Sequence, residues 1–133
     1  MKDPDMDIKV RAGIDKKSFE LFYNGGSIWC EHLDSMGDCN EKVKEKFLED
    51  YKMFNRPSMT SFMIVNLCET EMNEEIVSCI TETIIHSQKR YMKIAFVGVR
   101  KPERSAFREI QYRKKCAVSF FDDFEKAKQW VLP

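Results

Sequence analysis

The sequence contains no CxxC pair, and its five cysteines, at positions 30, 39, 68, 79 and 116, follow no regular spacing. The odd number of cysteines and the lack of an N-terminal signal peptide argue against the disulfide framework of a secreted protein. We therefore expect free thiols, a reducing environment and a cytoplasmic location.

Long hydrophobic runs are also missing. The longest stretch with few charges begins at Met53, is interrupted by Arg56 and ends at Glu69, which is too short to cross a bilayer. No charge of one sign predominates, because 22 Lys and Arg balance 22 Asp and Glu. The chain as a whole therefore gives no reason to expect nucleic-acid binding or a membrane span.

Glycine is scarce, with five residues in 133. Gly98 stands alone after an apolar run, so neither the glycine-rich dinucleotide fingerprint nor the phosphate-binding loop is present. We expect no cofactor. The apolar and charged fractions are ordinary, and the length suffices for one domain with its own core.

The centre of the chain reads as a strand, a helix and a second strand. Residues 61–67 and 92–99 are short apolar runs rich in branched and aromatic side chains, which predicts two strands covered on both faces. Between them, apolar residues recur at helical spacing, which predicts a helix from Asn73 to about Arg90. Two such strands joined by a helix make a parallel crossover, which is expected to be right-handed.

The segment before this unit predicts a β-hairpin. Two β-prone runs, 19–23 and 27–33, flank Asn24-Gly25-Gly26, and a tight turn needs the positive φ angles that Asn and Gly tolerate. Residues 1–17 are polar and weakly patterned, and we interpret them as a tail, with Val10–Ile14 as a further edge strand.

Three more helices and a strand complete the pattern. Asp38 or Asn40 is expected to cap a helix that Pro57 ends, Pro102 opens another, and Asp122 or Asp123 caps the last. The expected inward residues are Val43, Phe47, Leu48, Tyr51 and Phe54; then Ala106, Phe107 and Ile110; then Phe124, Ala127, Trp130 and Val131. Residues 117–121 predict a last strand. The fold class is α/β: a single domain over 18–133 with a mostly parallel sheet, an N-terminal hairpin and about four helices.

The potentially reactive residues form no catalytic or metal-binding pattern. Cys68 follows a strand and precedes a helix, but a phosphatase loop needs an arginine six residues later, and position 74 is Glu. Cys30, His32 and Cys39 lack the fourth ligand of a structural zinc site. We expect no enzyme activity and no metal.

His86 lies near the end of the central helix, where a cationic side chain is favoured by the helix dipole. Between positions 89 and 115 there are ten Lys or Arg and only two Glu. Within that stretch, Arg100, Lys101 and Arg104 lie where a strand ends and a helix begins, a place where open α/β sheets bind ligands. They are candidates for a surface that binds a partner or an anion, the alternative being solvated loop charges.

The last seventy or so residues resemble a STAS domain, the SpoIIAA-like fold of bacterial anti-sigma-factor antagonists. The resemblance rests on the strand 62–67, the helix from Asn73, the strand 93–98, and the ending in which Phe121 and Ala127 reproduce the pattern F-x-x-x-x-x-A. It implies a SpoIIAA-like fold and a regulatory protein partner, an anti-sigma factor or a kinase-like protein. Such single-domain proteins are also likened to lipid-binding Sec14-type domains.

One departure from the family concerns its phosphorylated serine. The antagonists carry Asp-Ser-Ser-Gly after the strand equivalent to 62–67, whereas this chain has Cys-Glu-Thr-Glu-Met-Asn-Glu-Glu over 68–75. Thr70 is the only hydroxyl there, and a phosphate on it would be repelled by the neighbouring glutamates.

The sequence therefore predicts a non-enzymatic interaction domain whose partner surface joins Thr70 and Asn73 to Arg100, Lys101 and Arg104. A homodimer stays open. The alternative is a carrier of a small apolar or lipid-like ligand, which requires a closed apolar cavity of several hundred Å³, as is typical of ligand pockets in general.

Overall fold

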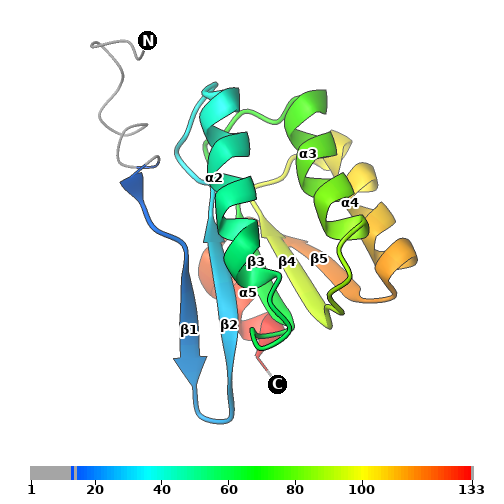
Figure 1. Cartoon of the computed structure of the whole chain (residues 1–133). Coiled ribbons are helices and arrows are strands. Elements are labelled where there is room, and N and C mark those ends of the chain that lie inside the picture. The colour runs from blue at the N-terminus through cyan, green and yellow to red at the C-terminus, as the bar shows by residue number, and fades with distance from the viewer. Residues whose placement is uncertain (1–12, 14, 133) are drawn as a thin grey trace.

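The computed structural model describes Gly13 and residues 15–132. One five-stranded sheet and the four helices α2 to α5 lie within these residues (Figure 1). In chain order the elements are β1 (Phe19–Tyr23), β2 (Gly26–His32), α2 (Asn40–Phe54), β3 (Phe62–Asn66), α3 (Glu74–Ile85), β4 (Lys93–Val97), α4 (Lys101–Lys114), β5 (Ala117–Phe121) and α5 (Phe124–Val131).

The strands lie in the sheet in the same order as in the chain, from β1 to β5. β1 pairs antiparallel with β2, and every following pair is parallel and is joined by a helix. The predicted fold class, α/β with a largely parallel sheet and an N-terminal hairpin, is therefore confirmed.

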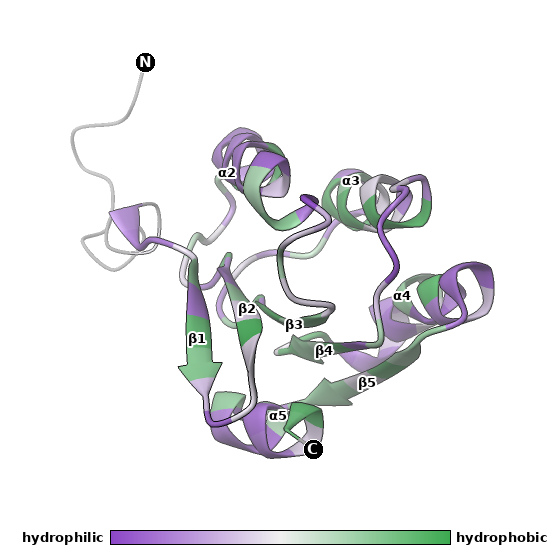
Figure 2. Ribbon diagram, turned by 60° about the horizontal axis from the view of Figure 1, so that its bottom comes forward, coloured by the Kyte–Doolittle hydropathy of each residue, from purple (hydrophilic) through white to green (hydrophobic). Residues whose placement is uncertain are grey.

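Two apolar layers cover the sheet unequally. Helices α2, α3 and α4 lie on one face, where Phe47, Ile80 and Phe107 pack against alternate strand residues. On the other face lies α5, whose Ala127 and Val131 contact Ile64 and its neighbours (Figure 2). β3 and β4 are buried on both faces, as their continuous apolar runs predicted.

The hairpin closes through a tighter turn than the sequence suggested. Tyr23 pairs with Gly26, so Asn24 and Gly25 alone form the turn, and Gly26 belongs to β2. Gly25 has a φ of 105°. A two-residue turn with a positive φ matches the twist of the strands it joins.

The central helix ends earlier than predicted. α3 stops at Ile85 instead of continuing to about Arg90, and His86 is its C-cap. The Ser87 hydroxyl donates to the Asn55 side chain at 2.6 Å and accepts from the Lys89 amide at 3.0 Å. These bonds hold the polar segment after Ile85 in a loop, because Ser and Asn side chains compete with the helical backbone pattern.

Some other local expectations are wrong, each for its own reason, and one is confirmed. Cys39 occupies the N-cap of α2 without a side-chain cap bond, so neither Asp38 nor Asn40 caps it. Leu48 is 44% exposed and Ala106 is also exposed, because each lies just outside the stripe that faces the sheet. Asp123 caps α5 by accepting from the Glu125 amide, as predicted.

The remaining inward predictions agree with the structure in most positions. The residues that are buried are Val43, Phe47, Phe54, Phe107, Ile110, Ala127 and Val131, whereas Tyr51, Phe124 and Trp130 are half-buried. Apart from Gly13, which is helical, the predicted edge strand Val10–Ile14 lies outside the described residues, as does most of the predicted tail. No helix within the described part of the chain combines the length and the apolar character that a membrane crossing requires.

Candidate functional site

The carboxyl ends of the parallel strands meet at one edge of the sheet, which we call the carboxyl rim and define as residues 33–39, 67–73, 98–100 and 122–123. Its first two loops are joined like short parallel strands by backbone hydrogen bonds. These bonds run from Ser35 N to Cys68 O (2.7 Å), from Gly37 N to Glu69 O (3.0 Å) and from Glu71 N to Gly37 O (2.7 Å). The rim is therefore an ordered surface.

Thr70 lies inside this joint. Its side chain is buried, and its hydroxyl donates to the Leu33 carbonyl while accepting from the Met36 amide at 3.1 Å. Both hydrogen-bonding roles of the hydroxyl are thus used within the protein. The predicted surface residue Thr70 holds two loops together from beneath.

Replacing Thr70 with valine is expected to lower the free energy of unfolding by about 2 kcal/mol, because a buried amide and a buried carbonyl lose their partner. Urea denaturation of the purified variant measures this loss. Thr81→Val is the matched control, since the Thr81 hydroxyl donates only to the carbonyls of Val77 and Ser78 within α3 itself. Equal losses in both variants would contradict the role assigned to Thr70.

Backbone strain gathers at the rim. Ser35 and Glu69 have φ angles of 59° and 57°, Gly37 has 55° and Gly98 has 84°. The Ser35 hydroxyl donates to the Glu69 carboxylate at 3.3 Å, so the two non-glycine residues in this conformation contact each other. A non-glycine residue in this conformation lowers the stability of the folded state by of order 1 to 3 kcal/mol, and such residues occur preferentially at functional sites.

Gly98 fixes the third loop of the rim against the second. A Cβ atom built on Gly98 would meet the Cys68 Cα at 2.7 Å and the Cys68 amide nitrogen at 2.8 Å. The Leu67 amide also donates to the Val97 carbonyl at 2.8 Å. The backbone of the loop before α4 therefore lies directly against the loop before α3.

Asn73 is the N-cap of α3, and its side chain accepts from the Ile76 amide at 2.9 Å. Arg100 is the N-cap residue of α4 and forms an ion pair with Glu103. Lys101 is exposed, and the described residues offer it no ion pair or hydrogen bond. Of the three predicted basic residues, Lys101 is the one whose charge is left for solvent or a partner.

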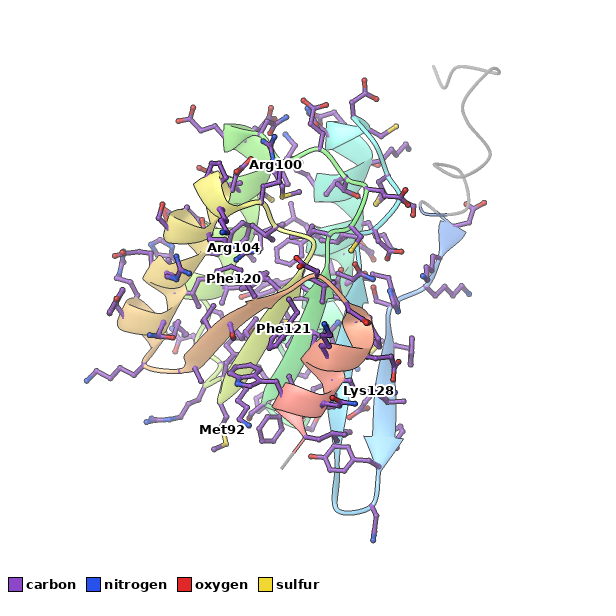
Figure 3. The ribbon with its side chains drawn as sticks, turned by 180° about the vertical axis from the view of Figure 1, so that it is seen from behind. Met92, Arg100, Arg104, Phe120, Phe121 and Lys128 are labelled. Atoms are coloured by element: carbon purple, nitrogen blue, oxygen red, sulfur yellow. The ribbon has the colours of Figure 1, made fainter. Side chains whose placement is uncertain are left out.

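Arg104 is used within the fold. Its Nε donates to the Val99 carbonyl at 3.0 Å, and its guanidinium lies 5.3 Å from the centre of the Phe120 ring. Figure 3 shows Arg104 beside Phe120 below the start of α4, where Arg100 lies. Arg108 approaches the same ring at 5.0 Å. These contacts hold α4 against β5. Arg104 therefore stabilises the packing of this helix, which the sequence did not predict.

Exposed carboxylates outnumber free cations on the rim. The exposed acidic residues are Asp38, Glu69, Glu71, Asp122 and Asp123, and Glu74 and Glu75 follow in the first turn of α3. Glu75 is paired with Lys44 of α2, and Asp122 lies 3.9 Å from Arg104. The rim thus presents a mostly negative surface, with the cationic residues Arg100, Lys101 and Arg104 at one side of it.

A buried histidine lies at the edge of the rim. The His32 Nδ1 is 3.2 Å from the Asp34 carboxylate, and its ring is stacked between Phe19 and Phe124. Although burial alone would raise the pKa of Asp34, hydrogen bonds from His32 and Lys16 and the charge of Lys16 lower it to about 2. Among the described residues, no hydroxyl or thiol is hydrogen-bonded to the His32 ring. The pair therefore lacks the nucleophile of a catalytic arrangement.

The surroundings of Cys30 and Cys68 disfavour their thiolate forms. Burial raises the pKa of Cys30 to about 11. Burial, followed by the charges of Asp34 and Glu69, raises the pKa of Cys68. A raised thiol pKa reduces the thiolate fraction at neutral pH, which is the nucleophilic form. In the described part of the chain, no group of three or more His, Cys, Asp or Glu side chains is placed to hold a metal ion.

Sequence reasoning missed the residues that shape the rim, which are Ser35, Gly37, Glu69 and Gly98. Gly37 and Gly98 were available as a signal, since an isolated glycine near the end of a strand often marks a close backbone approach. Ser35 and Glu69 left no such signal, because their conformations depend on the partner loop.

No protein-family model, no curated protein and no solved structure matches the chain.

Proposed function

We propose that this chain is a non-enzymatic, cytoplasmic interaction domain of the STAS (SpoIIAA-like) type, which binds a regulatory protein through the carboxyl rim. The supporting observation is the concentration of left-handed residues there, with Ser35 and Glu69 in contact across two loops. Strain of this kind persists only where surrounding contacts hold it, and a rigid loop surface binds a partner at low entropic cost.

The order of the elements agrees with this proposal. A hairpin is followed by repeated strand and helix windings, and the last strand leads into a helix capped by Asp123. The sequence resemblance to the STAS family rests on the same segments. The Sec14-type alternative needs an enclosed apolar cavity, whereas the pockets along α2 and along the Asn55 and Gln88 loops are open and lined largely by polar and charged residues.

The charge of the rim specifies the partner further. Its exposed carboxylates, which include Glu71 and Asp122, would be complemented by a basic surface on the partner. Lys101 would be complemented by a single acidic group on that partner. Arg104 contributes little to such an interface, because its guanidinium is bound to Val99 and Phe120. An anti-sigma factor or a kinase-like protein with a basic docking face is the partner class that we expect.

The double variant Glu71→Lys/Asp122→Lys tests this proposal, because it reverses charge on two loops of the rim without touching a buried side chain. We expect it to lose partners that the wild type captures from the cell extract of its source, and to bind a purified partner at least tenfold more weakly. Quantitative mass spectrometry of captured proteins, followed by titration of the purified partner, measures both effects.

Glu82→Lys/Glu109→Lys is the matched control, since it makes the same change in net charge on exposed positions of α3 and α4 away from the rim. It should retain the wild-type partners. If both double variants lost the same partners, net charge would explain the result, and if neither lost any, the rim would not be the partner surface.

A further inference from the structure

At the amino ends of the parallel strands, opposite the carboxyl rim, lies a pocket of about 200 Å³ with an unusual lining. It lies between the loop that follows α3 and the turn that follows α4, and five of its six lining residues are cationic. The lining residues are Gln88, Lys89, Arg90, Arg113, Lys114 and Lys115. We call this the cationic pocket. It lies away from the carboxyl rim, near the end of the sheet where Figure 3 places Met92.

Two of the lysines, Lys89 and Lys114, use their ammonium groups in hydrogen bonds within the fold. The Lys89 Nζ donates to the carbonyls of Arg56 and Met59 at 2.8 and 2.9 Å, and the Lys114 Nζ donates to the Ser87 carbonyl. These bonds tie the loop of residues 87–90 to both neighbouring segments. The walls of the cationic pocket are therefore held in place before any ligand arrives.

The other three cations have no such role. Arg90, Arg113 and Lys115 are exposed, and no described residue forms an ion pair or a hydrogen bond with their side chains. The dipoles of α3 and α4 favour a cation near each helix end, and Lys114 already donates to the Ser87 carbonyl just after α3. Three further cations around one pocket repel one another unless an anion neutralises them.

The backbone conformation of Lys115 is a second observation at the pocket. It ends α4 in the left-handed conformation with a φ of 54°, a position where glycine is the usual residue. A lysine there accepts a conformational penalty and places a positive charge at the pocket. The same turn built with glycine would be more stable and would lack that charge.

We infer that the cationic pocket binds the phosphoryl group of a phosphomonoester. Two guanidinium groups offer the paired donors that suit phosphate oxygens, and a dianion balances most of the three free charges. The pocket is too small for a whole drug-sized ligand. An adjoining pocket of about 410 Å³, which shares Gln88, Lys89 and Arg90 and is also lined by Asn55 and Ser61, has room for the rest of the molecule.

We expect one double variant of the pocket to be more stable than the wild type without phosphate and to gain less stability when phosphate is added. Without phosphate, Arg90→Gln/Arg113→Gln should melt a few degrees higher than the wild type, because repulsion between cations is relieved. With inorganic phosphate at about ten times its Kd, the wild type should gain about 4 °C at constant ionic strength set with chloride. The variant should show at least a tenfold weaker Kd by calorimetric titration and little gain in Tm.

Lys42→Gln/Lys126→Gln removes the same net charge from α2 and α5 and should respond to phosphate as the wild type does. Free phosphate and a lipid headgroup share the proposed chemistry, so co-sedimentation with phosphatidic acid vesicles, against phosphatidylcholine vesicles, separates the two sources. Binding of either probe that the pocket variant alone loses supports the inference. Equal stabilisation by phosphate and chloride, or equal phosphate binding by the pocket variant and the control, would overturn it.

Discussion

Gly98→Ala is expected to lower the free energy of unfolding by about 3 kcal/mol, the largest loss that we predict for a single methyl group in this chain. Two costs add. The φ of 84° is unfavourable for any residue with a Cβ, and that Cβ would lie 2.7 and 2.8 Å from the backbone of Cys68. Backbone atoms cannot move aside as a flexible side chain can. Chemical denaturation measures the loss.

Gly25→Ala separates the two costs. Gly25 also has a positive φ, of 105°, but a Cβ there would meet nothing within 4 Å. Its loss should be about 1 kcal/mol, from conformation alone. If Gly98→Ala cost no more than Gly25→Ala, the two loops would not be in close contact, and the rigidity assigned to the carboxyl rim would lose its basis.

The second large effect concerns a buried pair of carboxyl groups between β2 and α2. Glu31 is fully buried, and its Oε1 accepts from the Trp29 indole at 2.8 Å. Its Oε2 and the Asp50 Oδ2 are both buried and lack a donor. A single proton shared between the two groups would satisfy both oxygens, and we expect the folded protein to hold it. Burial, and then the contact with Asp50, raise the pKa of Glu31 well above its ordinary value.

Glu31→Gln should therefore stabilise the protein by about 2 kcal/mol at pH 8. A glutamine keeps the acceptor for Trp29 and donates permanently to Asp50. The sign follows from the raised pKa: the folded wild type holds a proton that the unfolded chain releases. Its stability relative to the variant therefore falls as pH rises from the ordinary pKa of a glutamate through the raised one. Below the ordinary value both states are protonated, and the advantage of the variant disappears.

Thermal unfolding of both proteins between pH 4 and pH 9 tests this dependence. Glu45→Gln on the outer side of α2 is the control, since its carboxylate is 65% exposed and pairs with Lys42. That control should track the wild type at every pH. A constant difference between Glu31→Gln and the wild type across the range would rule out the shared proton.

The secondary-structure elements and their order follow from local sequence patterns. Continuous apolar runs predicted β3 and β4, helical spacing of apolar residues predicted α3, and Asn24-Gly25-Gly26 predicted a hairpin turn at this place. These signals are local, because burial of a strand or of one helix face requires apolar residues at a fixed period. Leu48 and Ala106 mark the limit of the method, since the width of a buried stripe depends on the neighbouring elements.

Which loops meet, and which side chains are already hydrogen-bonded, depends on the folded chain. In the sequence Thr70 looks like an available hydroxyl. In the fold it is buried and hydrogen-bonded to the backbone of Leu33 and Met36 in the neighbouring loop. Arg104 looks like a surface charge, and it is held by Val99 and Phe120.

The cationic pocket likewise requires the folded chain, because its two segments, 88–90 and 113–115, are separated by β4 and most of α4. The physical reason is common to these cases. Secondary structure follows from interactions a few residues apart, whereas hydrogen-bond partners and clusters of charge depend on segments that only the fold brings together.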